Sequence, residues 1–149
     1  MKNKITAKEY SQAVKTASPN SALPKDMLCA FLIGGFICTL GQFFMNIYKM
    51  AGVEQEIAST AASVTLVFLS ATLTALGLYD KIAKHGGAGT LVPITGFANA
   101  VVSPALEFKT EGFVLGLGAK MFIIAGPVIV YGTLASVLYG LIIFIFNLY

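Results

Sequence analysis

Charged residues are scarce in this chain: they make up 11% of its 149 residues, and every basic side chain among them is a lysine. Soluble domains carry about twice that share of charge. With 56% hydrophobic residues and a mean hydropathy of +0.79, the chain has too little polar surface to cover a water-soluble fold. The composition therefore predicts an all-α integral membrane protein in a lipid bilayer.

The absence of arginine and the presence of a single histidine exclude several function classes. Specific base reading depends largely on bidentate arginine contacts, so the net charge of +3 does not indicate a nucleic-acid partner. One histidine without clustered carboxylates provides neither a metal-ligand set nor an acid–base pair. We therefore expect no enzyme, no metal and no cofactor. The two cysteines, Cys29 and Cys38, lie roughly 13 Å apart on one expected helix and cannot pair within it.

A polar tail, residues 1–25, precedes the apolar part of the chain, 26–149, which we expect to form one transmembrane domain. Within the tail, "TAKEYSQAVKTA" has the weak apolar spacing of a short interfacial helix. Half of the lysines fall in this tail, which predicts that the N-terminus is cytoplasmic. These lysines are Lys2, Lys4, Lys8, Lys15 and Lys25.

Three long apolar runs, at about 27–48, 57–79 and 120–146, can each cross a hydrocarbon core about 30 Å thick. Each run carries small or polar residues at helical spacing along one side. Such a stripe is either a packing face between helices or the lining of a wet path, and both interpretations stay open. The stripes consist of Gly34, Cys38, Gln42 and Asn46 in the first run, Ser63, Ser70 and Thr74 in the second, and Gly132, Ser136 and Gly140 in the third.

Between the second and third runs, residues 86–106 are uncharged but rich in glycine and proline. Pro93 suits the first turn of a new helix, and Pro104 disfavours helical conformation at Ser103 and should end that helix. The helix between them has about 11 residues, or roughly 16 Å, which is half a bilayer. The segment is either a re-entrant half-helix or a broken helix that spans with extended chain from "GGAG" and "EFKTEG". Non-helical backbone in hydrocarbon survives only against protein or water, so we expect this segment inside the assembly.

Polar residues of the broken segment suggest a path for a solute. Thr95, Asn99 and Ser103 share one face of the half-helix, and the Asn99 amide needs a partner or water. A structural hydrogen bond to another helix is the alternative for Asn99. Upstream, a basic and glycine-rich stretch leads into a helix N-terminus, an arrangement that favours anions, although its lysines also serve as topological anchors. That stretch contains Lys81, Lys84, His85, Gly86, Gly87 and Gly89.

The topology depends on which architecture holds. A cytoplasmic N-terminus places Glu54 and Glu56 outside and returns Lys81 and Lys84 to the inside. A spanning broken helix would then bring the C-terminus back to the cytoplasm, whereas a re-entrant one would leave it outside.

The stretch "GLYDKIAKHGGAGTLVPITGFANAVVSPALEFKTEGFVLGLGAKMF", residues 77–122, resembles the signature of the SpoVAC/SpoVAEB family of stage V sporulation membrane proteins. The polar N-terminal extension favours the AC type. The resemblance implies a subunit of a complex in the inner membrane of the bacterial forespore and spore, with related small membrane chains and a soluble subunit. It implies uptake of dipicolinic acid with calcium during sporulation, release at germination, and mechanosensitive channel behaviour of the AC type.

Two functions follow as hypotheses. The first is a channel or transport subunit for a small carboxylate; a chain this small would need several copies or related chains to enclose a path. The second is a non-conducting subunit that anchors soluble partners through its tail and loops, in which case the stripes are packing faces.

Overall fold

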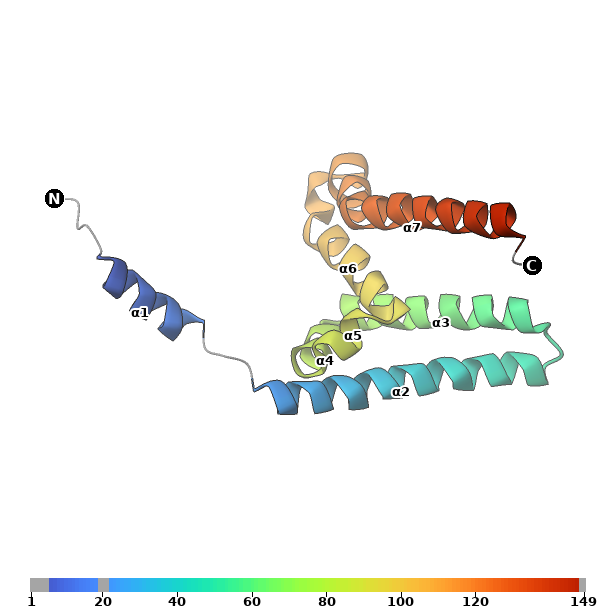
Figure 1. The fold of residues 1–149 in the computed structure, drawn as a ribbon, viewed down its shortest axis with the longest axis horizontal. Helices are drawn as coiled ribbons and strands as arrows, with labels where there is room; N and C mark the ends of the chain where they lie inside the picture. The colour runs from blue at the N-terminus through green and yellow to red at the C-terminus, as the bar shows by residue number, and fades with distance from the viewer. Residues whose placement is uncertain (1–5, 19–21, 148–149) are drawn as a thin grey trace.

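The computed structural model describes residues 6–18 and 22–147, and every regular element in these residues is helical (Figure 1). Lys2 and Lys4 of the expected cytoplasmic flank lie outside the described residues. A short helix, α1 (Ala7–Ala17), stands apart from a body of helices that begins with α2 (Leu23–Met50). The apolar part of the chain therefore becomes helical a few residues before the expected boundary at residue 26.

A capping box starts α1 and satisfies its first amides without help from the rest of the protein. The Thr6 hydroxyl accepts the Glu9 backbone N–H at 3.3 Å, and the Glu9 carboxylate accepts the Thr6 backbone N–H at 2.8 Å. The Thr6 hydroxyl also donates to the same carboxylate oxygen of Glu9, at 2.9 Å. The hydrogen bonds from the Thr6 backbone and, with a smaller effect, from the Thr6 hydroxyl hold the pKa of Glu9 below its ordinary value.

The first two spans, α2 and α3 (Gln55–Ala75), pack side by side as an antiparallel pair (Figure 1). Gly52, with φ of 84°, makes the turn between them. Ala58 and Ala62 are buried on α3, which fits the small residues that close helix contacts in membranes require. The second span ends at Ala75 rather than near residue 79.

The segment after α3 consists of three short helices: α4 (Tyr79–Gly86), α5 (Ala88–Leu91) and α6 (Ile94–Glu107). We call residues 79–107 the hairpin. The extended chain expected from "GGAG" is instead helical on both sides of Gly87, which alone breaks it with φ of 47° and ψ of −124°. Pro93 is the residue that caps α6, one position before the first turn in which it was expected.

The prediction that Pro104 ends the half-helix was wrong, because α6 continues through Ser103 and Pro104 to Glu107. Proline removes one backbone hydrogen bond from a helix. Here Val101 and Ala105 are buried on either side of that loss, so tertiary packing outweighs the local preference. The half-helix is 14 residues long instead of about 11.

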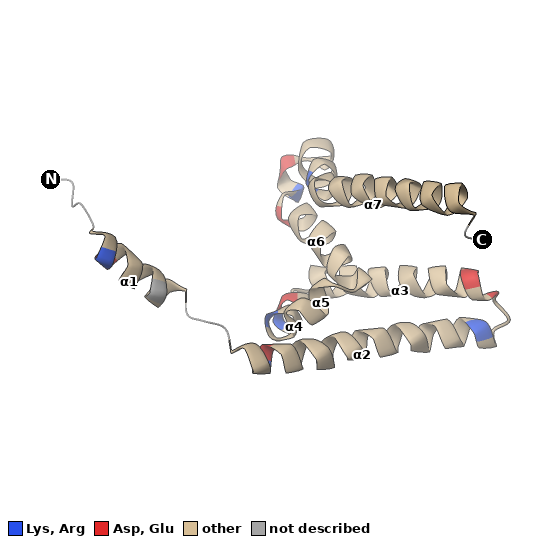
Figure 2. Ribbon diagram, in the orientation of Figure 1, with Lys and Arg blue, Asp and Glu red and all other residues tan. Residues whose placement is uncertain are grey.

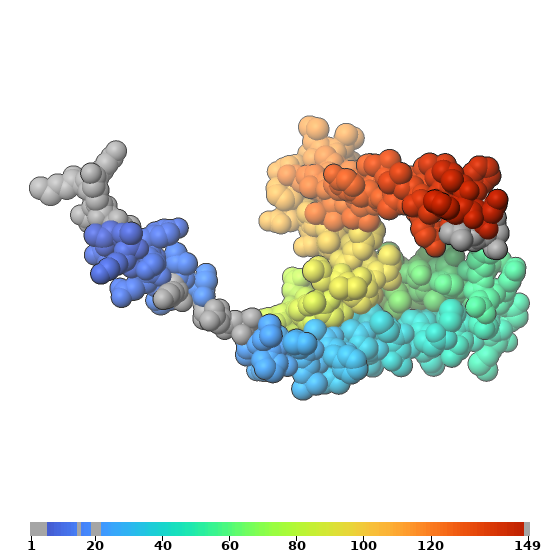
Figure 3. Space-filling view, viewed as in Figure 1, coloured from blue at the N-terminus to red at the C-terminus, as the bar shows by residue number. Residues whose placement is uncertain are grey.

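After α6 the chain forms a 3₁₀ turn, η1 (Lys109–Glu111), and a π-helical stretch, η2 (Phe113–Gly118), which leads into α7 (Ala119–Phe146). The extended conformation considered for "EFKTEG" therefore does not occur. The start of α7 packs against α6 and η2. From residue 127 onward almost every side chain of α7 is exposed, and in Figure 3 this helix forms one edge of the body while α2 forms the opposite edge.

Three helical stretches of the described residues are long and apolar enough to cross a membrane: Leu23–Met50, Gln55–Ala75 and Phe113–Phe146. Figure 2 shows charged residues at the two ends of this body and none along its middle. The start of α2, α4 and the segment after α6 carry the charges of one end, which we call the hairpin end; the α2–α3 turn carries those of the other. In Figure 1, α6 runs back toward the hairpin end and α7 ends on the opposite side, which is the arrangement that a re-entrant half-helix requires.

Candidate functional site

Buried hydroxyl groups attach the hairpin to α3. The Ser70 hydroxyl donates to the Thr95 carbonyl at 2.6 Å. The Tyr79 hydroxyl donates to the Thr90 carbonyl at 2.8 Å and lies 3.1 Å from the Thr95 hydroxyl. All four residues are at most 6% exposed. Since a buried polar group without a partner is costly in a membrane, these bonds specify how α3, α4, α5 and α6 fit together.

The second link between the hairpin and α3 is the pair formed by Thr74 and Asn99. The Thr74 hydroxyl lies 2.8 Å from the Asn99 side-chain oxygen and 2.8 Å from the Ser70 carbonyl. Asn99 is only half-buried, so its carboxamide is anchored on one side and accessible on the other. Of the two interpretations left open for Asn99, a bond to another helix is therefore present, and an accessible face remains beside it.

The glycines of the hairpin allow α5 to lie directly on the backbone of α2. A Cβ on Gly89 would collide with the Ala30 carbonyl, and one on Gly34 would come within 3.1 Å of Gly89. A Cβ on Gly86 would meet Thr90 and Ile33, whereas one on Gly87 would meet nothing. Gly86, Gly89 and Gly34 are therefore packing positions in this chain, and Gly87 is the turn.

A hollow of about 320 Å³, the hairpin hollow, opens in the bend between α4, α5 and α6. Tyr79, Gly87, Thr90, Gly96 and Asn99 line it together with two alanines and a leucine. It thus joins the accessible side of Asn99 to the turn at Gly87, within the re-entrant part of the chain.

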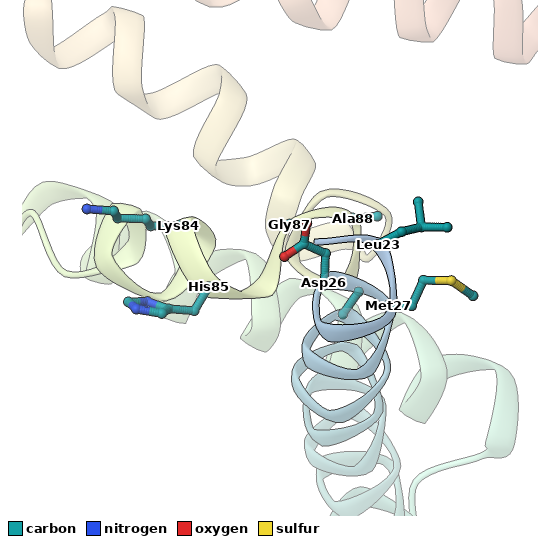
Figure 4. A pocket seen from close by; sticks show the side chains of 8 residues that line it. Leu23, Asp26, Met27, Lys84, His85, Gly87 and Ala88 are labelled. Carbon is teal, nitrogen blue, oxygen red and sulfur yellow. The ribbon is translucent and has the colours of Figure 1, made fainter. Parts of the chain in front are cut away.

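A second hollow, of about 380 Å³, lies at the hairpin end between the start of α2 and the α4–α5 turn; we call it the end hollow. Asp26, Lys84, His85 and Gly87 line it (Figure 4). The Asp26 carboxylate lies toward Gly87, whereas the Lys84 and His85 side chains extend away from α2. Gly87 lines both hollows, so the turn at Gly87 lies between the charged end hollow and the hairpin hollow.

The residues of the predicted anion site lie on different elements of the structure. Lys81, Lys84 and His85 are exposed at the hairpin end, and His85 Nδ1 lies 3.0 Å from the Lys81 carbonyl on the same helix. The helix that follows the glycines, α5, has only four residues. The longer α6 begins against Ser70, and α5 lies between it and the lysines in the chain. The lysines and the half-helix N-terminus are therefore separate features.

The polar stripes divide into buried and exposed parts. Ser70, Thr74, Thr95 and Asn99 come together in the network, and Ser103 lies half-buried further along α6. Of the four stripe positions on α2, Gly34 packs against Gly89. The exposed positions are Cys38, Gln42, Asn46, Ser63, Gly132, Ser136 and Gly140.

The sequence pattern does not single out two residues of the network, Tyr79 and Thr90. Tyr79 falls at the apolar end of the second expected span, and Thr90 falls in the glycine-rich turn. The available signal was that a phenol at the end of an apolar run needs a hydrogen-bond partner when it is buried.

Comparison with known proteins gives two matches. The model of the SpoVAC/SpoVAEB sporulation membrane protein family matches residues 26–142. Stage V sporulation protein AC of Bacillus subtilis (strain 168) is 43% identical over 139 residues, which cover 93% of each chain. No solved structure shows a significant match.

Proposed function

Because the chain belongs to the SpoVAC/SpoVAEB family of sporulation membrane proteins, we propose that it is a subunit of a spore membrane channel for dipicolinic acid. In this proposal the complex lies in the inner membrane of the forespore and spore. It moves dipicolinate with calcium inward during sporulation and outward at germination, and it responds to membrane tension. The solute, the compartment and the response to tension come from the family resemblance.

The observation that carries the proposal is the placement of Asn99. Its carboxamide is held by Thr74 on one side and borders the hairpin hollow on the other. Polar groups in a membrane segment are expensive and mark solute pathways more often than lipid-facing surfaces. A re-entrant half-helix that presents such a group fits a narrow part of a path.

The charges at the hairpin end are consistent with a solute that combines an anion with a cation. Lys81 and Lys84 lie close to Asp80 on α4, and further charges of both signs lie from the end of α6 onward. Dipicolinate has two carboxylates, which lysines attract, and calcium prefers carboxylate oxygens. These further charges are those of Glu107 at the end of α6, Lys109 and Glu111 in η1, and Lys120 at the start of α7.

Several chains must enclose the path, and the exposed polar part of α2 indicates where they meet. Gln42 Nε2 donates to Asn46 Oδ1 at 2.9 Å, and both residues are exposed. Their remaining polar groups would be costly in hydrocarbon. We propose that this face meets water or other subunits of the complex, with the N-terminus on the cytoplasmic side.

Flux measurements on the complex, reconstituted in liposomes loaded with calcium dipicolinate, test the proposal. We expect Asn99→Leu to slow release about tenfold, since a hydrogen bond of about 1–1.5 kcal/mol to the passing solute is lost. Thr39→Val is the matched control, because the Thr39 hydroxyl is exposed on α2 and bonds only its own helix, at the Gly35 carbonyl. Unchanged release by Asn99→Leu at equal protein level would exclude Asn99 from the path.

The second candidate function is a non-conducting subunit that anchors a soluble partner. The separation of α1 from the body favours it, because a helix that stands apart leaves its surface accessible to a partner (Figure 1). Deleting residues 1–22 would then abolish recruitment of the soluble subunit, and the complex would release dipicolinate equally well with Asn99 or Leu at position 99.

A further inference from the structure

A third hollow, of about 280 Å³, lies on the α2–α3 pair next to α4. We call it the lateral hollow. Ile33, Phe36 and Leu40 of α2 line one wall, and Leu69 and Leu73 of α3 line the other. Ile82 closes it at α4. The hollow therefore lies within two spans that are long and apolar enough to cross the bilayer, and it takes no part in the path proposed above.

The polar residues that border the lateral hollow have their hydroxyls bonded elsewhere. Ser70 donates to the Thr95 carbonyl, Tyr79 donates to the Thr90 carbonyl, and Thr72 donates to the Phe68 carbonyl at 2.8 Å. A buried water needs two to four polar partners. The hollow offers mainly hydrocarbon side chains instead, so it suits an apolar occupant.

The rim of the lateral hollow opens sideways toward the lipid-facing surface. Phe36 is 63% exposed, and Leu69 and Ile82 are about 40% exposed. The hollow is thus continuous with the surface that the two spans present to the bilayer. It is nearly twice the size of a cavity of about 150 Å³ that accommodates benzene, and an empty space of this kind forfeits dispersion contacts that a flexible chain would restore.

We propose that the lateral hollow is a binding site for one acyl chain of a bilayer phospholipid. The acyl chain lies between α2 and α3 and contacts Ser70, Tyr79 and Thr95, the same residues that hold the hairpin. The protein retains this bound lipid more strongly than the lipids around the rest of its surface. This site does not depend on the channel proposal, because it requires no flux.

The chain contains no tryptophan, so a single introduced indole reports on its own surroundings. We would compare Phe36→Trp, at the rim of the hollow, with Tyr131→Trp, which replaces an exposed aromatic residue of α7. Both variants are reconstituted in phospholipid brominated on the acyl chains, which quenches nearby tryptophan. Each is then extracted into a sterol-based detergent, which has no flexible alkyl tail to exchange into the hollow.

We expect both tryptophans to be quenched in vesicles and only Phe36→Trp to remain quenched after extraction. Adding Leu73→Phe to Phe36→Trp narrows the hollow and should restore fluorescence to the level of Tyr131→Trp. If extraction restored the fluorescence of Phe36→Trp to the same extent as that of Tyr131→Trp, the proposal would be overturned. So would a Phe36→Trp signal that bromine never quenches in vesicles, since protein rather than lipid would then cover the hollow. Both outcomes use conservative aromatic replacements at exposed positions, so neither depends on the folding of the Leu73→Phe variant.

Discussion

Tyr79 shows at the scale of one residue how the hairpin is kept in place. Its hydroxyl lies at the meeting point of α4, α5 and α6, where it bonds the Thr90 carbonyl and adjoins the Thr95 hydroxyl. The aromatic ring packs against its neighbours, and the hydroxyl forms the hydrogen bond that fixes how the three helices are oriented. Removing only the hydroxyl therefore separates the two contributions.

Tyr79→Phe should destabilise the protein by about 1 kcal/mol, since interhelical hydrogen bonds in membranes average about 0.6 kcal/mol and reach about 1.7 kcal/mol. This corresponds to a fall in Tm of roughly 2–4 °C in a chain of this size. Thermal unfolding in detergent measures it. The control is Tyr139→Phe on α7, which is exposed and has no hydrogen bond to the described residues. Equal effects of the two changes would contradict the role given to Tyr79.

Glycines at contact points are the other residues on which the fold depends. Gly89→Ala would place a methyl group against the Ala30 carbonyl, and overpacking of this kind destabilises by about 1–3 kcal/mol. Gly35→Ala is the matched control on α2, because its Cβ meets nothing and alanine favours a helix by up to about 1 kcal/mol. Thermal unfolding should show a loss for Gly89→Ala and no loss for Gly35→Ala. A stable Gly89→Ala protein would mean that α5 does not lie on α2.

At the scale of elements, α1 depends on its capping box, which is sensitive to pH. The hydrogen bonds from Thr6 lower the pKa of Glu9, so their support for the helix is complete above the ordinary Glu pKa of about 4.3. It is lost as the pH falls through the lowered pKa.

The backbone chemical shifts of residues 7–10 should therefore be helical at neutral pH and move toward coil values in strong acid. Glu9→Gln retains a side-chain acceptor that does not titrate in this range, so its shifts should change much less. Identical titrations of the two proteins would show that the capping box does not support α1.

The helical elements were predictable to the extent that local composition determines them. Long runs without charge predicted three spans, and Pro93 and Gly87 predicted a break between the second and third. The helix through Pro104 was not predictable, because it depends on Val101 and Ala105 being buried. The hydrogen bond between Thr74 and Asn99 was not predictable either. Each residue lies on a polar stripe of the sequence, but the two come together because α6 packs against α3.

At the scale of the whole molecule, the body has two charged ends and an apolar middle (Figure 2). One of the three spanning helices, α7, contacts the rest of the described chain mainly near its own start. Such an open arrangement suits a subunit whose exposed faces meet lipid and other subunits, which is the assembly we propose for the spore membrane. The enclosed path would then lie between chains, with the hairpin of each chain contributing to it.

The central claim is that the hairpin enters and leaves the membrane on one side, and cysteine labelling tests it most directly. Cys29 and Cys38 are first replaced by alanine, and single cysteines are then introduced at the exposed positions Lys81, Thr110 and Gln55. A membrane-impermeant maleimide is applied to one face of sealed vesicles. We predict that Lys81→Cys and Thr110→Cys react from the same face and Gln55→Cys only from the other. Labelling of Thr110→Cys together with Gln55→Cys would show that α6 crosses the membrane and would contradict the account.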